Sequence, residues 1–168
     1  MQAVGKKLED LALAEGDQKL LDLYGRSAYN RYYYAAFLAV REMIRKIDGD
    51  DKRINHASVS EILEKRILKK LKLRIKSLSK KEFITQSEAD RLKSSAQTAT
   101  SSLSEMMKRA YDLRAIADYE PETKVEFSGS VIYLLDYKLS KAQRWFDEAN
   151  AYCKKIIKLW DEVASGEF

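Results

Sequence analysis

The feature that most constrains the fold is an apolar stripe with an unbroken spacing of three and four between residues 89 and 117. Apolar residues at this spacing share one face of a helix, and four heptads of them are typical of a long helix packed against another. The alanines in the stripe favour a close approach of that neighbour. We therefore predict a helix that begins at Thr85, with Glu88 completing a capping box, and ends at Pro121. The stripe consists of Ala89, Leu92, Ala96, Ala99, Leu103, Met106, Ala110, Leu113 and Ala117.

Similar apolar stripes predict four further helices. Asp48-Gly49-Asp50-Asp51 ends the second of them, and Ser58 with Glu61 forms a capping box that opens the third. We expect a loop over 119–130 and find no alternating pattern that predicts a strand. The predicted ranges are 2–14, 17–47, 58–77 and 131–163. The stripe of the last range is Val131, Leu135, Leu139, Ala142, Phe146, Ala149, Cys153, Ile156, Trp160 and Val163.

The predicted helices have few breakers, because the 168 residues include one proline and six glycines. Helices of this length bury their apolar stripes by lying side by side. We expect an all-α fold: a long four-helix bundle with a short additional N-terminal helix. The length fits a single domain over residues 1–168.

Charge and cysteine content suggest the compartment. The net charge of +5 permits a polyanionic partner without requiring one, because Lys- and Glu-rich helix surfaces are usually only solvated. The single cysteine, Cys153, fits a small buried side chain in a reducing compartment. Neither a signal peptide nor a membrane-spanning run is visible. We expect a soluble cytoplasmic protein that does not contact a membrane.

A first chemical cluster runs from Arg26 to Phe37 and contains two arginines and four tyrosines. One interpretation is an aromatic core in which Arg31 pairs with Asp118 or another carboxylate. The other is an Arg/Tyr surface, including Arg26, Arg31 and Tyr34, that stacks on bases and binds phosphates. The sequence leaves both open.

Two more clusters flank predicted helix ends. Asn55-His56-Ala57-Ser58 precedes the third predicted helix and suggests capping, with His56 in local contacts. Arg114 and Asp118 lie four residues apart, which predicts a helix-surface ion pair, and Tyr119 follows them. Because His56 is the only histidine, one chain has no two-histidine metal site, and we expect neither a metal nor another cofactor.

Together these three clusters resemble the HEPN superfamily (the higher eukaryotes and prokaryotes nucleotide-binding domain), in particular its prokaryotic stand-alone branch. Asn30-Arg31-Tyr-Tyr-Tyr-Ala-Ala-Phe37 is similar to that branch's Ser-Arg-x-Tyr-Tyr-Ala-x-Phe stretch. His56-Ala-Ser58-Val59 resembles its His-x-Ser/Gly-Val element. Leu113-Arg114-x-x-Ala117-Asp118-Tyr119 resembles its Leu-Arg-x-x-Ala-Asp-Tyr signature. The likeness covers residues 17–163.

The resemblance implies a helical homodimer that binds RNA or nucleotides in a shared cleft. Many members are metal-independent endoribonucleases that act as toxins or in phage defence, often paired with a nucleotidyltransferase-type antitoxin. It assigns catalysis to Arg114, Tyr119 and His56, and RNA binding to Arg26, Arg31, Tyr34 and Asp118. However, Tyr119 stands where a ribonuclease member has its histidine, and tyrosine, with a pKa near 10, is a poor base at neutral pH.

Two possibilities therefore stay open: the protein binds and cleaves RNA, or it binds RNA without cleaving it. The alternative is a non-catalytic helical interaction module that dimerises and acts through a partner protein. Both interpretations include a homodimer, because the alanine-rich stripe and the many tyrosines provide more apolar surface than one thin bundle covers.

Overall fold

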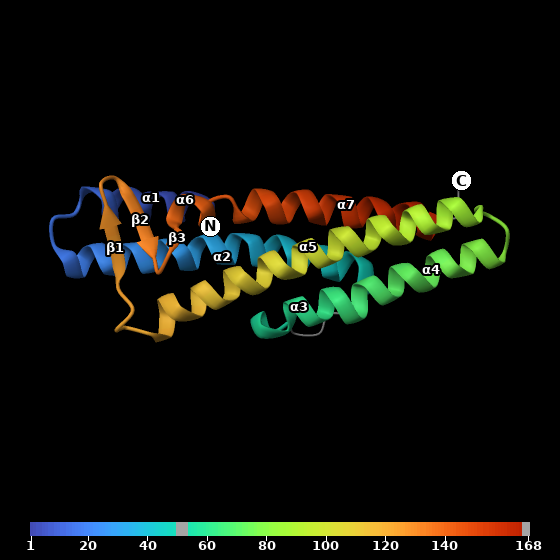
Figure 1. Cartoon of the computed structure of the whole chain (residues 1–168), viewed down its shortest axis with the longest axis horizontal. Helices are drawn as coiled ribbons and strands as arrows, with labels where there is room; N and C mark the ends of the chain where they lie inside the picture. The colour runs from blue at the N-terminus through green and yellow to red at the C-terminus, as the bar shows by residue number, and fades with distance from the viewer. Residues whose placement is uncertain (50–53, 166–168) are drawn as a thin grey trace. The chain divides into compact units, whose positions relative to one another are not determined.

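A computed structural model describes residues 1–49 and 54–165 and is mostly helical with a small three-stranded sheet (Figure 1). The chain divides into two compact units. The first unit contains Met1–Leu38 and Arg109–Glu148, and the second contains Ala39–Lys108 and the chain from Ala149 onward. None of the helices in the described ranges is both long and apolar enough to cross a membrane.

Three of the predicted helices are confirmed nearly to the residue. They are α1 (Gln2–Ala14), α2 (Gln18–Asp48) and α5 (Gln86–Tyr119). The predicted capping box also forms: the Glu88 amide donates to Thr85 Oγ1 at 3.2 Å, and the Thr85 amide donates to Glu88 Oε2 at 2.8 Å. At the end of α2, Gly49 adopts φ +61° and donates to the Arg45 carbonyl. Asp50 and Asp51 lie outside the described residues.

The third predicted helix begins differently. A 3-10 turn (His56–Ser58) comes first, and its cap is Asn55, whose side chain accepts from the Ala57 amide. The capping box predicted at Ser58 is wrong, because Asn55 supplies the cap and the Ser58 hydroxyl donates back to the Asn55 carbonyl. The helix then continues through α3 (Val59–Glu61), a π-helical stretch (Ile62–Ile67) and α4 (Leu68–Lys80).

The expected loop is confirmed for residues 120–124, but the prediction for residues 125–138 is wrong, because strands occupy part of that loop and the start of the expected last helix. They are β1 (Val125–Ser128), β2 (Val131–Leu134) and β3 (Tyr137–Lys138), in an antiparallel sheet of order β1-β2-β3. Ser128 pairs with Val131 and Leu134 with Tyr137, so both turns contain two residues. Gly129, at φ +62°, supplies the left-handed conformation that the first turn needs.

The final predicted helix is instead α6 (Leu139–Ala142) followed by α7 (Trp145–Ser165). Most of the predicted apolar positions of α5 and α7 are buried, and three differ by one residue. Met107, Trp145 and Leu159 are buried where Met106, Phe146 and Trp160 were expected. Cys153 is buried as predicted, and burial raises the pKa of its thiol to about 12.

The first unit is organised around α2. On one side, Gly5 of α1 allows a close approach: an added Cβ would lie 2.7 Å from Tyr32 Cε1. The Tyr32 hydroxyl donates to Glu9 Oε2 at 2.6 Å, which attaches α1 to α2. Gly25 provides the same clearance for Val125 of β1, where a Cβ would lie 2.7 Å from Cγ1.

A buried tyrosine attaches the hairpin to the same helix. The Tyr29 hydroxyl donates to the Tyr137 carbonyl and accepts from the Leu134 amide at 3.2 Å. Trp145 is buried beside these strands, and its indole N–H donates to the Tyr137 hydroxyl at 2.9 Å. β2 and β3 are therefore held by side-chain bonds as well as by their own ladder.

In the second unit, α4 and α5 are joined by the short turn around Lys81 and run antiparallel (Figure 1). Ser60 and Ser104 exchange hydrogen bonds, each hydroxyl donating to the other's carbonyl at 3.1 and 3.3 Å. Arg74 donates to the carbonyls of Val163 and Ala164 near the end of α7. These contacts join α3, α4, α5 and α7 within the unit.

Candidate functional site

The first unit brings two predicted clusters together: the Arg26–Tyr34 face of α2 and the last turns of α5 from Arg114 to Tyr119. Both lie on long helices, so helical spacing fixes the directions of their side chains. The residues that meet come from positions almost 90 apart in the sequence, as the Asn30–Asp118 contact shows.

Arg26 anchors the C-terminal end of α5. Its Nε donates to both carboxylate oxygens of Asp22 at 3.0 Å, and its terminal nitrogens donate to backbone carbonyls. All three guanidinium nitrogens therefore have acceptors within the protein. The carbonyl acceptors are those of Ile116, Ala117, Glu120, Pro121 and Thr123. A helix leaves its last carbonyls without partners, and Arg26 satisfies that of Ala117 here, while the Ile116 carbonyl also accepts from the Glu120 amide.

Asp118 lies at the centre of a polar contact between the two helices. Its carboxylate oxygens accept from the Asn30 amide at 2.8 and 2.9 Å, and Oδ2 lies 2.7 Å from Arg114 Nη2. The side chains of Arg114 and Asp118 are 12% and 22% exposed, so the pair is largely shielded from water. Within the described residues, Asn30 Oδ1 and Arg114 Nε are buried and have no hydrogen-bond partner.

Aromatic rings flank the Arg114 guanidinium. Its Cζ lies 5.8 Å from the Tyr34 ring centroid and 5.4 Å from that of Tyr119. Arg31 lies over the same Tyr34 ring at 5.9 Å. Arg31, Tyr34, Arg114 and Tyr119 thus form a continuous series of guanidinium groups and rings, which we call the Arg–Tyr cluster.

The surroundings of Arg114 stabilise its charged form. Burial opposes the cation, but the charge of Asp118 and the hydrogen bond with Tyr119 outweigh it and raise the pKa of Arg114. Tyr119 itself is 70% exposed. The cluster therefore combines a held cation with an aromatic ring that a ligand can reach.

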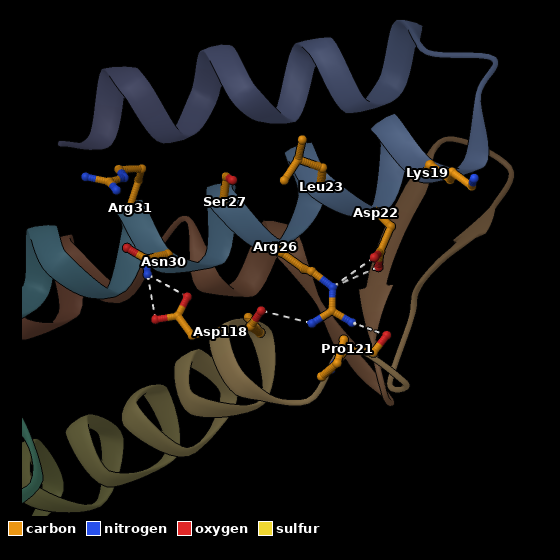
Figure 2. Close-up of a pocket in the computed structure, with 10 residues that line it drawn as sticks. Lys19, Asp22, Leu23, Arg26, Ser27, Asn30, Arg31, Asp118 and Pro121 are labelled. Atoms are coloured by element: carbon orange, nitrogen blue, oxygen red, sulfur yellow. Dashed lines mark hydrogen bonds and ion pairs between the residues drawn. The ribbon is translucent and has the colours of Figure 1, made fainter.

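A pocket of about 540 Å³ opens beside the cluster. Figure 2 shows Lys19 and Arg31 at opposite ends of it, with the Arg26 and Asp118 contacts between them. The pocket mixes cations with the two carboxylates already engaged by Arg26 and Asn30. It is lined by Lys19, Asp22, Leu23, Arg26, Ser27, Asn30, Arg31, Ala117, Asp118 and Pro121.

The structure corrects one sequence interpretation and adds two residues. One of the two interpretations paired Arg31 with Asp118 or another carboxylate, but the partners of Asp118 are Arg114 and Asn30, while Arg31 lies over Tyr34. Asp22 and Asn30 were missing from the predicted site. Their i to i+4 spacing from Arg26 marked both as same-face neighbours.

His56 belongs to the second unit, so its association with Arg114 stays a prediction. In the part of the chain that the structure describes, no three His, Cys, Asp or Glu side chains form a group suited to a metal ion. Comparisons of the chain with protein-family models, curated proteins and solved structures found no match.

Proposed function

We propose that the chain is a HEPN-like four-helix-bundle protein that dimerises and binds RNA or a nucleotide at the Arg–Tyr cluster. The observation that carries the proposal is Tyr119, which is 70% exposed while its ring lies 5.4 Å from the Arg114 guanidinium. An exposed ring beside a fixed cation suits a nucleic acid, whose bases stack on aromatic rings and whose phosphates pair with arginine.

Each residue has a distinct role in this proposal. Tyr119 stacks on a base, and Arg31 at the end of the pocket pairs with a phosphate. Tyr34 supports both guanidinium groups, since each lies within 6 Å of its ring centroid, at 5.9 Å for Arg31 and 5.8 Å for Arg114. Arg26 and Asp118 act as positioning residues, because their polar groups hold the end of α5 and the Arg114 side chain.

Cleavage is the further step of the proposal. RNA cleavage through the 2′-hydroxyl needs a base, an acid and a cation that stabilises the phosphorane. Arg114 would supply the cation and His56 the imidazole, with the partner subunit completing the cleft. We give binding precedence over cleavage because Asp118, 2.7 Å away, already neutralises Arg114.

The same ion pair favours a second candidate, a non-catalytic module that acts through a partner protein. In that case the Arg114–Asp118–Asn30 contact is a structural network, and the partner is a nucleotidyltransferase-type antitoxin or another defence protein. Salt-insensitive binding to such a protein, without affinity for RNA, would favour this candidate.

The binding test uses fluorescence anisotropy with a labelled RNA and the full-length chain. We expect Arg114→Ala and Tyr119→Ala to weaken binding at least tenfold, the scale of one stacked base at about 1–3 kcal/mol. Tyr119→Phe should bind like wild type if stacking dominates. Arg109→Ala removes an exposed cation from the same helix and is the matched control. If all four variants bind RNA with the affinity of wild type, the Arg–Tyr cluster is rejected as the binding site.

The cleavage test incubates the protein with total RNA in EDTA, which removes contaminating metal-dependent nucleases. Cleavage that is lost in both Arg114→Ala and His56→Ala would support a metal-independent ribonuclease. Intact RNA in every sample would restrict the proposal to binding. Sedimentation at micromolar concentration tests the dimer, and a monomer would contradict a cleft shared by two chains.

A further inference from the structure

A second basic surface lies in the second unit, on the helix that follows the π-helical stretch. Residues 65–81 contain nine lysines and arginines and no aspartate or glutamate. None of these residues belongs to the Arg–Tyr cluster. A cationic run without acids differs from the mixed charge typical of a solvated helix.

About half of these cations have partners within the protein. Lys65 pairs with Glu61 at 3.0 Å, and Arg66 and Lys70 both pair with Asp48. Arg74 donates to carbonyls at the end of α7. These four cations are therefore engaged by the protein itself.

Four of the five remaining lysines form a row along the exposed face, and the fifth, Lys81, follows the end of α4. Lys69, Lys72, Lys76 and Lys80 follow each other at spacings of three and four, so they share one side of α4. At 1.5 Å per residue the row is about 16 Å long. Lys93 of α5 lies beside it, and we call these five residues the α4 lysine band.

The α4 lysine band lines two adjoining grooves. One groove, of about 320 Å³, is lined by Lys69, Lys72 and Lys76 with Glu64, Leu68 and Leu73. The other, of about 410 Å³, contains no acidic residue. Its lining is Lys72, Lys76, Ser79, Lys80, Gln86 and Lys93. Only two contacts restrain the band in the described ranges: Lys72 donates to Gln97, and Lys93 pairs with Asp90 at 3.1 Å.

We infer that the α4 lysine band binds the sugar–phosphate backbone of nucleic acid, independently of the Arg–Tyr cluster. A duplex has one phosphate charge per roughly 1.7 Å of axis with both strands counted, so a segment as long as the row carries roughly ten phosphates around its circumference. Lysine on a flexible stem suits this contact, because it binds phosphate as a point charge without requiring a fixed geometry. The band therefore supplies affinity that does not depend on sequence.

An anionic membrane is the other polyanion to consider. A helix that lies on a membrane inserts a broad apolar face, and the apolar face of α4 is buried within the protein. Leu73 is the one large apolar side chain of α4 with high exposure, at 57%. One leucine among lysines favours a phosphate backbone over a lipid surface.

The test measures the salt dependence of binding to labelled duplex RNA, duplex DNA and phosphatidylserine vesicles. The variant is Lys72→Gln/Lys76→Gln/Lys80→Gln in the full chain. The matched control is Lys154→Gln/Lys155→Gln/Lys158→Gln, which removes the same charge from exposed positions of α7. With about 0.9 counterions released per phosphate contact, the slope of log K against log salt should fall by about 2.7 in the variant only.

Between 50 and 200 mM salt, wild type should therefore lose roughly 40-fold more affinity than the band variant does. RNA and DNA duplexes should bind alike. If the triple variant unfolds, the Lys76→Gln/Lys80→Gln double variant replaces it, with an expected slope change of about 1.8.

Three outcomes would overturn the inference: an unchanged slope, an equal change in the α7 control, or lysine-dependent binding to vesicles alone. Arg114→Ala separates this site from the proposed function. In the Arg114→Ala background, the triple lysine variant should still lower the slope by about 2.7, so loss of either site leaves the other measurable.

Discussion

Arg26 should be a main stabilising residue of the first unit, and Arg26→Ala tests this directly. The substitution removes the nearer cation of the Asp22 carboxylate, which is 15% exposed, and frees the carbonyls of Ala117 and Thr123. Removing one partner of a buried pair costs about 3–5 kcal/mol, because the other charge stays buried. Asp22 keeps the Val125 amide at 2.8 Å and Lys124 at 3.7 Å, so we expect the lower end, about 3 kcal/mol.

Thermal unfolding followed by circular dichroism measures this cost. For a chain of this size, 1 kcal/mol corresponds to about 2–4 °C, so Tm should fall by about 6–12 °C. Arg26→Lys keeps a cation but lacks the planar fork, and should recover only part of the loss. Arg109→Ala, at an exposed position of α5, is the control and should stay within about 0.5 kcal/mol of wild type.

A double-mutant cycle with Asp22→Ala completes the experiment. Because the two side chains share one ion pair, the double variant should cost clearly less than the sum of the single variants. If Arg26→Ala is no less stable than Arg109→Ala, or if the cycle is additive, the anchoring role assigned to Arg26 is refuted.

Three further predictions concern packing, backbone strain and pH. Gly25→Ala should destabilise the protein by about 1–3 kcal/mol, because the new Cβ would lie 2.7 Å from Val125 Cγ1. In chemical denaturation Val125→Ala should restore part of this loss, and no restoration would contradict a clash at this contact. Leu135→Gly should stabilise by about 1 kcal/mol, because Leu135 has φ +55° and is 53% exposed at the second hairpin turn; a lower Tm would contradict this. Burial raises the pKa of the three buried tyrosines of α2, so their neutral forms stabilise the fold fully below pH 10. Above about pH 10 each of these tyrosines should lower the free energy of unfolding by up to about 1.4 kcal/mol per pH unit. Their absorbance at 295 nm should rise only when the protein unfolds. Titration of all ten tyrosines before unfolding would refute this.

The long helices could be predicted from the sequence because their stripes repeat over many turns. Eight of the nine stripe residues of α5 are buried, and the Thr85–Glu88 box marks its start. A pattern sustained for about 30 residues has no competing interpretation as strands. Short elements lack that redundancy.

The hairpin was missed for this reason. Val131, Leu135 and Leu139 also fit a helical stripe, and a four-residue strand contains too few alternations to outweigh it. In the structure Ile132 and Leu134 are buried instead, while Leu135 lies exposed in a turn. Ser128-Gly129-Ser130 between two β-prone segments was the local signal for the turn.

The candidate site was only partly visible because its contacts join α2 to α5. Sequence spacing pairs Arg114 with Asp118 on one helix, and this pair is confirmed at 2.7 Å, although its side chains are largely shielded where a surface pair was predicted. It does not show which residue of another helix completes the contact. Asn30 is the partner, whereas one of the two interpretations of the sequence proposed Arg31, one position further.

The capping of α5 by Arg26 also bears on the entropy of binding. The last turn of a helix normally frays, and a ligand that binds there must first restrict several backbone and side-chain conformations. Here the carbonyls of Ala117 and Glu120 are held by α2, so the turn that carries Tyr119 is already ordered in the free protein. Ordering a site before its ligand arrives removes that cost from the binding free energy. Part of the affinity of the Arg–Tyr cluster would then depend on Arg26, a residue whose guanidinium nitrogens are all engaged by the protein itself.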